Sequence, residues 1–404
     1  MGVTGIELEA AVEMIVSHTK MVGEKEEVNI IDAGGRILAQ DIIADMDQPP
    51  FPRSPLDGFA LASQSVQGAG REGGIWLEVI ATVYAGDYLT VEIPAGKAVK
   101  IMTGAPIPAG CDCVIRQEEV EYNDQQVMIF RELAAFENYC FAGEDYKKGA
   151  LLLAEYEKIG FAETGILASA GLDKVSVFCR PRIAVFATGD ELQSPGTILK
   201  PGKIYDSNLH MMRSRLQELG MAVPVAEQLP DDPETAAVRL WQVSAEVDAI
   251  ITAGAVSVGE KDMFHQVLPM LGCERLFWRV NLKPGTPAMF AVLNETPMLH
   301  LSGNPFAALT TLELLGRPML YQLIKDPAIP MRKMQVVLSK AFDKESAGRR
   351  FIRAYYDGTS VIVPEICKHA SGVLSSMKGC NCLVDIPPET ARLTAGEPVQ
   401  IWRL

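Results

Sequence analysis

The sequence predicts a multidomain α/β plus β protein, in which a central doubly wound α/β domain is accompanied by an inserted β-rich domain and a C-terminal β domain. Apolar runs alternate with amphipathic helical patterns between residues 181 and 328, which is typical of a parallel sheet covered by helices. Short alternating segments broken by Gly and Pro fill residues 46–145 and 329–404, which predicts compact β domains. A length of 404 residues accommodates several such units.

These patterns divide the chain into four expected domains. Residues 1–45 and 146–180 are expected to form an elongated N-terminal domain, into which the β-rich domain at 46–145 is inserted. The α/β domain, of the kind that binds molecules such as nucleotides at its strand ends, is expected over 181–328. The C-terminal β domain covers 329–404.

Composition limits the classes of function. The formal charge of −14 argues against a nucleic-acid binder, which is normally basic, although a local basic cluster can still attract a small anion. No apolar run approaches the roughly 20 residues of a membrane-spanning helix, and the N-terminus lacks a signal-peptide pattern. The eight cysteines include the pairs Cys111/Cys113 and Cys380/Cys382. This Cys-x-Cys spacing favours buried thiols in a reducing cytoplasm over a zinc site.

The stretch 247–262 reads V-D-A-I-I-T-A-G-A-V-S-V-G-E-K-D. Its β-branched apolar start is typical of a buried parallel strand, and open α/β sheets bind ligands where such strands end. Gly254 lets a ligand approach the backbone, Ser257 can donate a hydrogen bond, and Asp262 can hold a metal. The alternative is an ordinary strand-to-helix connection with Asp262 as the helix N-cap.

A proline-rich loop lies at 48–61, with the sequence Q-P-P-F-P-R-S-P-L-D-G-F-A-L. Its prolines fix the backbone and exclude a helix or a central strand. We expect this rigid loop to hold Ser54 and Asp57 in fixed positions, and the alternative is a domain linker with a plain Asp-Gly turn. Further along, Thr103 precedes a glycine and can present its hydroxyl to a ligand or simply form a turn.

Other predicted strands of the α/β domain also end in polar turns. Because the carboxyl ends of parallel strands meet at one edge of a sheet, these side chains are expected on one rim. They are Glu191, Ser257, Asp262, Lys283, Ser302 and Asn304. The turn Asp231-Asp232-Pro233 is expected to combine a helix cap with one functional carboxylate, for which Asp232 is chosen.

Six motifs occur in order along the chain: P-P-F-x-x-S-x-x-D-G, M-T-G-A-P, T-G-D-E-L, G-x-V-S-V-G-x-x-D, K-P-G-x-P and G-N-P. With them the whole chain resembles the MoeA-type molybdopterin molybdenumtransferases, bacterial relatives of the C-terminal domain of gephyrin. The resemblance implies an enzyme that inserts molybdenum from molybdate into adenylylated molybdopterin and releases AMP with a divalent cation such as Mg²⁺. It also implies a homodimer whose active site lies between the α/β domain of one subunit and the proline-rich loop of the other.

The resemblance assigns roles to the residues that match the family motifs. The catalytic positions are Asp57, Thr103, Glu191, Asp262 and Lys283. The substrate-binding positions are Ser54, Asp232, Gly254, Ser257, Arg279, Asn304, Arg353 and Ser371. Glu191 and Asp262 are the expected metal ligands, because carboxylates hold a hard cation that bridges phosphoryl oxygens. Arg353 with Ser371 suits a tetrahedral oxyanion, with a solvated surface pair as the alternative.

Several loops depart from the family pattern, at Pro52-Arg53, Pro55-Leu56, Ala255, Thr286 and Phe306. Gly348-Arg349-Arg350, together with Arg353, forms the basic cluster of the C-terminal domain and is consistent with closing an anion pocket. Two other interpretations stay open. One is a pterin adenylyltransferase, which would consume ATP. The other is a pterin-nucleotide binding or scaffold protein without metal insertion, which would not need Asp262 or Lys283.

Overall fold

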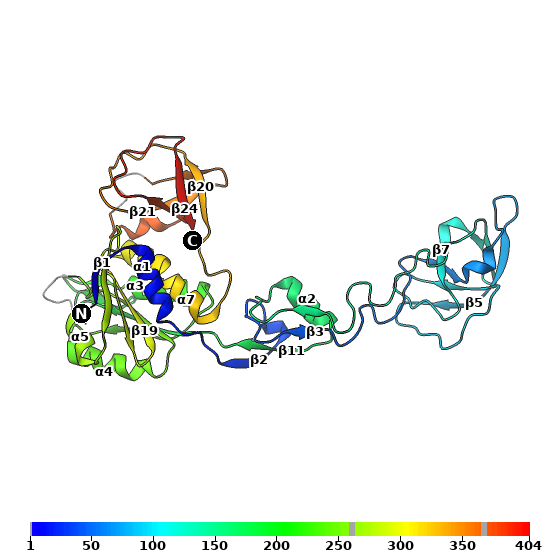
Figure 1. Ribbon diagram of the computed structural model, residues 1–404, viewed down its shortest axis with the longest axis horizontal. Coiled ribbons are helices and arrows are strands. Elements are labelled where there is room, and N and C mark those ends of the chain that lie inside the picture. Colours follow the sequence, from blue (N-terminus) through cyan, green and yellow to red (C-terminus); the bar gives the residue numbers. More distant parts are fainter. Residues whose placement is uncertain (1, 258–262, 365–369) are drawn as a thin grey trace.

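The computed structural model describes residues 2–257, 263–364 and 370–404. The chain forms an elongated molecule of four units (Figure 1). An α/β unit with a small barrel stacked on it forms one end, a narrow unit forms the middle, and a β-rich unit forms the other end. This is the predicted combination of an α/β domain with inserted and C-terminal β domains. Both chain termini lie at the α/β end.

The α/β unit is built on a seven-stranded sheet in the order β1-β17-β18-β19-β16-β12-β15. Neighbouring strands run parallel except β18, which is antiparallel to both of its neighbours. The strands are β1 (Val3–Ile6), β17 (Arg275–Val280), β18 (Met289–Leu293), β19 (Thr296–Leu301), β16 (Ala249–Ala253), β12 (Arg182–Thr188) and β15 (Ala222–Leu229). Every residue of β16 is buried, as expected for a strand covered on both faces.

Helices cover both faces of this sheet. They are α1 (Leu8–Ser17), α3 (Asn208–Glu218), α4 (Pro233–Ser244), α5 (Phe264–Met270), α6 (Pro305–Thr311) and α7 (Arg317–Ile324), with the π-helical turn η4 (Leu312–Gly316) between the last two. Helices α1, α3, α6 and α7 share one apolar cluster with the sheet, and α4 and α5 share another. Alternate residues of β12 and β16 enter the two clusters, so the sheet is doubly wound as predicted.

The first strand and helix belong to the α/β unit. Strand β1 pairs in parallel with β17, with Val3 opposite Phe277, and Ile15 of α1 is fully buried in the cluster under the sheet. The sequence-based boundary instead groups residues 1–45 with the elongated domain. Residues 3–17 lie on the sheet because β1 extends its edge by backbone pairing and α1 covers an apolar face there.

The middle unit consists of two short antiparallel ladders and one helix. Its elements are β2 (Lys25–Asn29) paired with β11 (Lys174–Phe178), β3 (Ile42–Ile43) paired with β10 (Leu151–Leu153), the 3₁₀ turn η1 (Ile30–Asp32) and α2 (Phe161–Ser169). A small apolar cluster that includes Leu38, Ile159 and Leu167 holds them together. This narrow unit separates the α/β unit from the β-rich unit (Figure 1).

The β-rich unit contains a six-stranded sheet in the order β7-β4-β6-β5-β9-β8. Its elements are β4 (Gly58–Leu61), η2 (Ser63–Val66), β5 (Ile75–Val83), β6 (Lys97–Ile101), β7 (Cys113–Arg116), η3 (Gln117–Glu119), β8 (Glu121–Tyr122) and β9 (Gln126–Ile129). Cys111 and Cys113 are buried free thiols in the apolar clusters of this unit. Burial raises the pKa of Cys111 to about 12, which keeps its thiol protonated.

The C-terminal unit is a closed barrel of five strands in the order β20-β22-β21-β23-β24. Its elements are β20 (Lys333–Leu338), β21 (Arg350–Tyr356), β22 (Ser360–Ile362), the 3₁₀ turn η6 (Leu374–Met377), β23 (Cys382–Ile386) and β24 (Pro398–Arg403). Backbone hydrogen bonds join it to the loop after β17. The Lys283 amide donates to the Arg349 carbonyl at 2.9 Å, and the Lys283 carbonyl accepts from the Phe351 amide at 2.7 Å.

Within the described ranges, no helix combines the length and apolarity needed to cross a bilayer. The seven cysteines of these ranges are free thiols. The same residues contain no group of three or more His, Cys, Asp or Glu side chains that is placed to hold a metal ion. A short parallel pair, β13 (Leu192–Gln193) and β14 (Ile204–Tyr205), completes the structure beside the α/β sheet.

Candidate functional site

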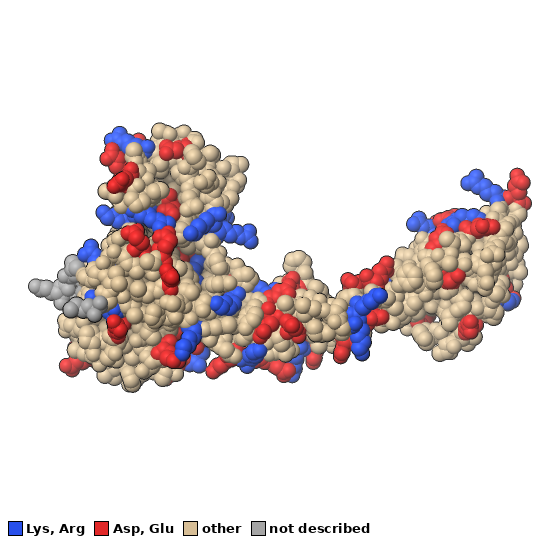
Figure 2. Space-filling model, viewed as in Figure 1, with Lys and Arg blue, Asp and Glu red and all other residues tan. Residues whose placement is uncertain are grey.

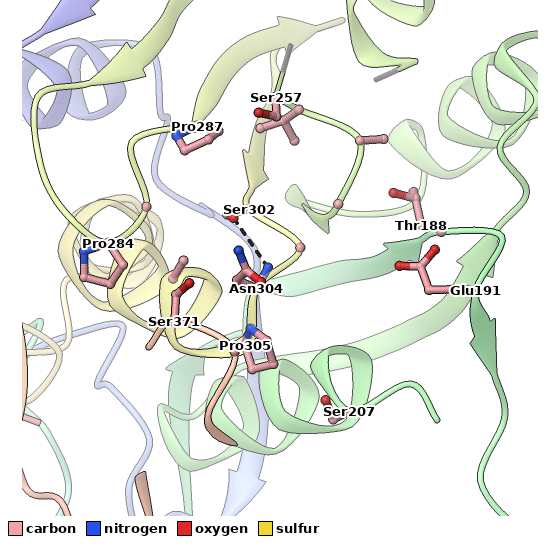
Figure 3. Close-up of a pocket in the computed structure, with 18 of the residues that line it drawn as sticks. Thr188, Glu191, Ser207, Ser257, Pro284, Pro287, Ser302, Asn304, Pro305 and Ser371 are labelled. Carbon is pink, nitrogen blue, oxygen red and sulfur yellow. Dashed lines mark hydrogen bonds between the residues drawn. The ribbon is translucent and has the colours of Figure 1, made fainter. Parts of the chain in front are cut away.

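Strands of the α/β unit end at a cavity of about 820 Å³ (Figure 3). The parallel strands β12, β15, β16 and β19 direct their carboxyl ends toward it, which is the usual ligand position of an open α/β sheet. The polar or small lining residues from these strand ends are Thr188, Gly189, Asp231, Gly254, Ser257 and Ser302. The starts of α3 and α6, the loop at 284–287 and a barrel segment around Ser371 supply the remaining wall.

The turn after β16 brings backbone to the wall of the cavity. Gly254 has a φ of +105°, and a Cβ atom there would lie 2.5 Å from the Thr188 carbonyl oxygen, so glycine is required. The Gly254 amide donates to the Leu301 carbonyl at 2.9 Å, which ties the end of β16 to β19. Ala255 has a φ of +53°, a left-handed conformation that costs an alanine about 1 kcal/mol. Both Gly254 and Ser257, which follow β16, line this cavity.

Two carboxylates lie on one side of this cavity. Glu191 is exposed on the loop after β12 (Figure 3), and its carbonyl accepts a hydrogen bond from the Ile204 amide at 2.8 Å. Asp231 lines the cavity after β15 and accepts a hydrogen bond from the Asp190 amide at 3.1 Å. The turns after β12 and β15 are thus bonded to each other, which keeps the two acidic side chains on one wall.

Asp232 does not line the cavity. Its carboxylate caps α4 by accepting a hydrogen bond from the Thr235 amide at 2.9 Å, and hydrogen bonding by Thr235 lowers the pKa of Asp232. The structure therefore places Asp231 on the cavity, whereas Asp232, the member chosen from the sequence, is turned toward the helix that it caps. Asp262, the other expected metal ligand, lies outside the described residues.

Neutral polar groups form another part of the wall. Asn304 precedes α6, and its amide donates to the Ser302 hydroxyl at 3.4 Å. Ser371 comes from the C-terminal unit, and its carbonyl accepts from the Phe306 amide at 3.0 Å. Ser207 lies at the start of α3 (Figure 3), where the helix dipole favours anions and the Leu209 amide already donates to the Asp206 carboxylate at 3.1 Å.

A second cavity of about 210 Å³ adjoins the first, because Pro284 and Ser371 line both. Lys283 and Arg350 supply its basic side chains, Ser371 is polar, and the other lining residues are apolar. The sequence predicted Lys283 on the same rim as Glu191. The structure places Lys283 on the second cavity instead, on the other side of Pro284.

Arg353 and Arg279 line neither cavity. Arg353 is fully buried, donates from Nη2 to the Ala370 carbonyl at 3.0 Å, and places its guanidinium carbon 4.1 Å from the centre of the Phe306 ring. The alternative of a solvated surface pair is wrong for Arg353, since the barrel and Phe306 enclose it. Arg279 is exposed and lies 5.6 Å from the centre of the Trp278 ring.

Asp57 and Thr103 come together in the β-rich unit. One carboxylate oxygen of Asp57 accepts hydrogen bonds from both the amide and the hydroxyl of Thr103, each at 2.7 Å. Ser54 is buried beside them and is held by backbone hydrogen bonds to Gly104 and Ala105. This unit is at the opposite end of the molecule from the α/β unit (Figure 1), so these residues do not reach the cavity within one chain.

Known families match nearly the whole chain. The MoeA N-terminal region (domain I and II) matches residues 6–171, a molybdopterin-binding domain matches 184–322, and the MoeA C-terminal region (domain IV) matches 335–404. A molybdopterin molybdenumtransferase from Bacillus subtilis (strain 168) is 33% identical over 393 residues, which are 96% of this chain and 91% of the relative. The chain belongs to the molybdopterin molybdenumtransferase family.

Other members of the molybdopterin molybdenumtransferase family agree in extent and in fold. The Haemophilus influenzae relative is 32% identical over 383 residues, covering 94% of this chain and 93% of the relative. Two crystal structures of MoeA proteins of molybdopterin biosynthesis from Pyrococcus horikoshii match with TM-scores of 0.87 and 0.84, at 30% and 27% identity. Each match covers 99% of this chain and at least 99% of the other.

Two polar residues that line the cavity of this molybdopterin molybdenumtransferase, Thr188 and Ser207, were not predicted as site residues from the sequence. Thr188 ends β12 and is nearly buried, and it appeared in the sequence only as the first letter of T-G-D-E-L. Ser207 precedes α3 in a D-S-N stretch, a recognisable helix start. The signal in the sequence that points to Ser207 is its place at a helix start next to the strand ends.

Proposed function

We propose that this protein inserts molybdenum from molybdate into molybdopterin that is presented as an adenylylated nucleotide, with release of AMP. The observation that carries the proposal is a pair of adjoining cavities, one wide and polar and the other small and basic, which share Pro284 and Ser371. A pterin nucleotide and an oxyanion bound in them would be neighbours. The relatives are named molybdopterin molybdenumtransferases, which favours this proposal over a scaffold or an adenylyltransferase.

The larger cavity suits a pterin nucleotide. Its volume of about 820 Å³ lies within the range of cavities that enclose ligands of that size. Gly254 and Gly303 are neighbours on its wall, since a Cβ on Gly303 would be in van der Waals contact with the Gly254 Cα at 3.5 Å, and neither residue has a side chain that would occupy the cavity. Ser207 at the start of α3 lines this cavity, where the helix dipole favours a phosphate.

The smaller cavity suits molybdate. Lys283 and the Ser371 hydroxyl provide a charge and a hydrogen-bond donor beside the apolar wall. Figure 2 shows lysine and arginine side chains, with acidic side chains between them, where the barrel meets the α/β unit. The two cations that line the smaller cavity can attract an anion even though the net charge of the chain is −14.

Glu191 and Asp231 fit a divalent cation such as Mg²⁺. Both carboxylates line the larger cavity, and Mg²⁺ is commonly held by one or two carboxylates together with waters and substrate phosphates. A bound cation would offset charge on the phosphoryl group that leaves with AMP. Glu191 would hold it at the mouth of the cavity, and Asp262 is an additional candidate ligand outside the described residues.

We further propose a homodimer in which two subunits share each active site. Asp57 and Thr103 form a preorganised pair of polar groups, yet they lie at the far end of the same chain from the cavity (Figure 1). A second copy arranged with two-fold symmetry can bring the pair of one subunit to the cavity of the other. Asp57 would then orient the nucleotide or its cation from across the subunit boundary.

The test is to incubate the purified protein with adenylylated molybdopterin, molybdate and Mg²⁺ and to follow AMP. We expect AMP release that requires both molybdate and the cation, together with the appearance of metal-loaded pterin. ATP consumption with unadenylylated pterin would indicate the adenylyltransferase. An absence of molybdate-dependent AMP release would refute metal insertion.

A further inference from the structure

The turn after β16 is held by two side chains that are not among the described residues lining the cavity. The Trp278 indole donates from Nε1 to the Val256 carbonyl at 2.9 Å, and His265 Nε2 lies 3.2 Å from the Ser257 carbonyl oxygen. Val256 and Ser257 both line the larger cavity, and Figure 3 shows Ser257 at its edge. Trp278 of β17 and His265 of α5 therefore hold two consecutive peptide groups of the cavity wall.

The partners of His265 decide which ring nitrogen carries the hydrogen. Arg275 Nη1 lies 3.1 Å from His265 Nδ1. A guanidinium can only donate and a carbonyl oxygen can only accept. The arrangement therefore requires the tautomer in which Nδ1 accepts from Arg275 and Nε2–H donates to the Ser257 carbonyl. In this form the imidazole links β17 to the turn.

The Trp278 ring is packed as well as hydrogen-bonded. The His265 ring lies edge-on to it, with the ring centres 4.7 Å apart. The guanidinium carbons of Arg275 and Arg279 lie 5.5 and 5.6 Å from the indole centre, which is within the range of cation–π contacts. Arg279 is an expected substrate-binding residue, so Trp278 contacts both this guanidinium and the turn.

The backbone just before Val256 does not keep its shape by intrinsic preference. Gly254 and Ala255 have φ values of +105° and +53°, and a left-handed alanine persists only where the surrounding structure imposes it. The hydrogen bonds to the Val256 and Ser257 carbonyls come from other elements of the fold and impose the conformation on this turn.

We propose that Trp278 and His265 are positioning residues for the pterin nucleotide, which act by holding the Val256 and Ser257 carbonyls at the wall of the larger cavity. The assignment rests on the proposed function, because that function supplies the ligand of this cavity. Val256 is 2% exposed, so water does not readily replace the indole N–H. Ser257 is exposed, and water can replace part of what His265 provides. Trp278 therefore contributes more than His265.

The experiment compares the wild type with W278F, H265F, H265Q and W241F. W278F keeps an aromatic ring and removes the N–H. H265F removes both ring nitrogens, whereas the amide of H265Q keeps one acceptor and one donor. Trp241 is an exposed tryptophan of α4 and provides the matched control. Equilibrium dialysis gives the Kd of adenylylated molybdopterin, and AMP release gives kcat and the KM values for the nucleotide and for molybdate.

We expect W278F to raise the Kd and KM for the nucleotide about tenfold, and H265F to raise them about threefold. The KM for molybdate should stay within about twofold, because the smaller cavity is lined by other residues. H265Q should return the nucleotide KM to within about twofold of the wild type, and W241F should behave as the wild type. This selective change in one KM distinguishes positioning from a general loss of folded protein.

The outcomes separate this assignment from the proposed reaction. Wild-type nucleotide affinity in W278F overturns the assignment of Trp278, and wild-type affinity in H265F overturns that of His265. A lower kcat with both KM values unchanged also overturns the assignment, because the side chains would then support only the fold. If W278F weakens nucleotide binding but the wild type releases no AMP, the assignment stands and the proposed reaction fails.

A measurement on the unaltered protein covers the case in which the variants do not fold. The protein is labelled with ¹⁵N-histidine, and the NMR signals of His265 are identified by elimination, by substituting the other four of the five histidines. The imidazole ¹⁵N chemical shifts should show a hydrogen on Nε2 and none on Nδ1. A hydrogen on Nδ1 would contradict the link from Arg275 through His265 to the turn.

Discussion

The cavity of the α/β unit and the Asp57–Thr103 pair of the β-rich unit differ in how they are assembled. The cavity gathers the ends of four strands that are distant in sequence. The pair forms where two loops of one small sheet meet, with Thr103 donating twice to one oxygen of Asp57. The cavity encloses space beside groups that can bind an anion, whereas the pair consists of two polar groups held in fixed positions. Each region therefore supplies what the other lacks.

The largest expected effect comes from two carboxylates that are not buried, Glu191 in the α/β unit and Asp57 in the β-rich unit. Glu191→Gln and Asp57→Asn should each lower the rate of AMP release about 100-fold, because each removes a charge that positions the phosphoryl group or its cation. Melting temperatures should stay near that of the wild type, since neither side chain is buried. Glu246→Gln and Asp124→Asn, exposed in the same two units, are the matched controls. A normal rate of AMP release for Asp57→Asn would show that the β-rich unit does not contribute to the active site.

A second prediction concerns how tightly the cavity is built. Gly254→Ala should lower the free energy of unfolding by about 2–4 kcal/mol, because its Cβ would meet the Thr188 carbonyl and its φ is positive. Gly272→Ala is the control, since Gly272 has a φ of +66° but nothing within 4 Å of an added Cβ. It should cost about 1 kcal/mol. If urea unfolding gives equal losses of unfolding free energy for the two variants, the close approach of Gly254 to Thr188 contributes nothing to that loss.

The pair in the β-rich unit predicts a pH effect. Hydrogen bonds from the Thr103 amide and then its hydroxyl lower the pKa of Asp57. Because folding lowers the pKa of Asp57, its ionised carboxylate stabilises the folded protein above the ordinary carboxyl pKa. This contribution is lost as the pH falls through the lowered pKa. Thr103→Val removes the hydroxyl and keeps the amide, so the pKa of Asp57 should rise and the acid limb of activity should move to higher pH. A ¹³C NMR titration of the Asp57 carboxyl checks this, and an unmoved pKa would contradict it.

The smallest effect is expected beside the cavity at Ala255. Ala255→Gly should raise the free energy of unfolding by about 0.5–1 kcal/mol, since the residue has a φ of +53°. Ala168→Gly, in the exposed part of α2, should instead lower it by about 1 kcal/mol. Thermal unfolding of both variants gives opposite signs if the backbone at Ala255 is strained, and the same sign if it is not.

The sequence predicted the parts of this molecule that depend on patterns along the chain. The apolar run of β16 and the glycine after it predicted both a buried strand and a cavity at its end, because parallel strands share a carboxyl edge. Side-chain direction could not be predicted. Whether Asp231 or Asp232 faces the cavity depends on which carboxylate caps α4, and the two are adjacent.

The arginines of the barrel show the same limit. Arg349, Arg350 and Arg353 are equally basic in sequence, but their roles depend on the register of β21 and on the position of Phe306. The structure shows that Arg353 is buried, and the oxyanion contact expected there from the motif stays a prediction. Position relative to a neighbouring unit, not residue type, decides which guanidinium faces the cavity.

The most direct test of the shared site is subunit complementation. Asp57→Asn and Glu191→Gln proteins are unfolded together, refolded as a mixture, and assayed for AMP release. In a two-fold symmetric dimer with shared sites, half of the dimers are mixed and each contains one intact site, so activity should return to roughly a quarter of the wild-type value. A mixture as inactive as either variant alone would contradict the account, because each site would then be made by a single chain.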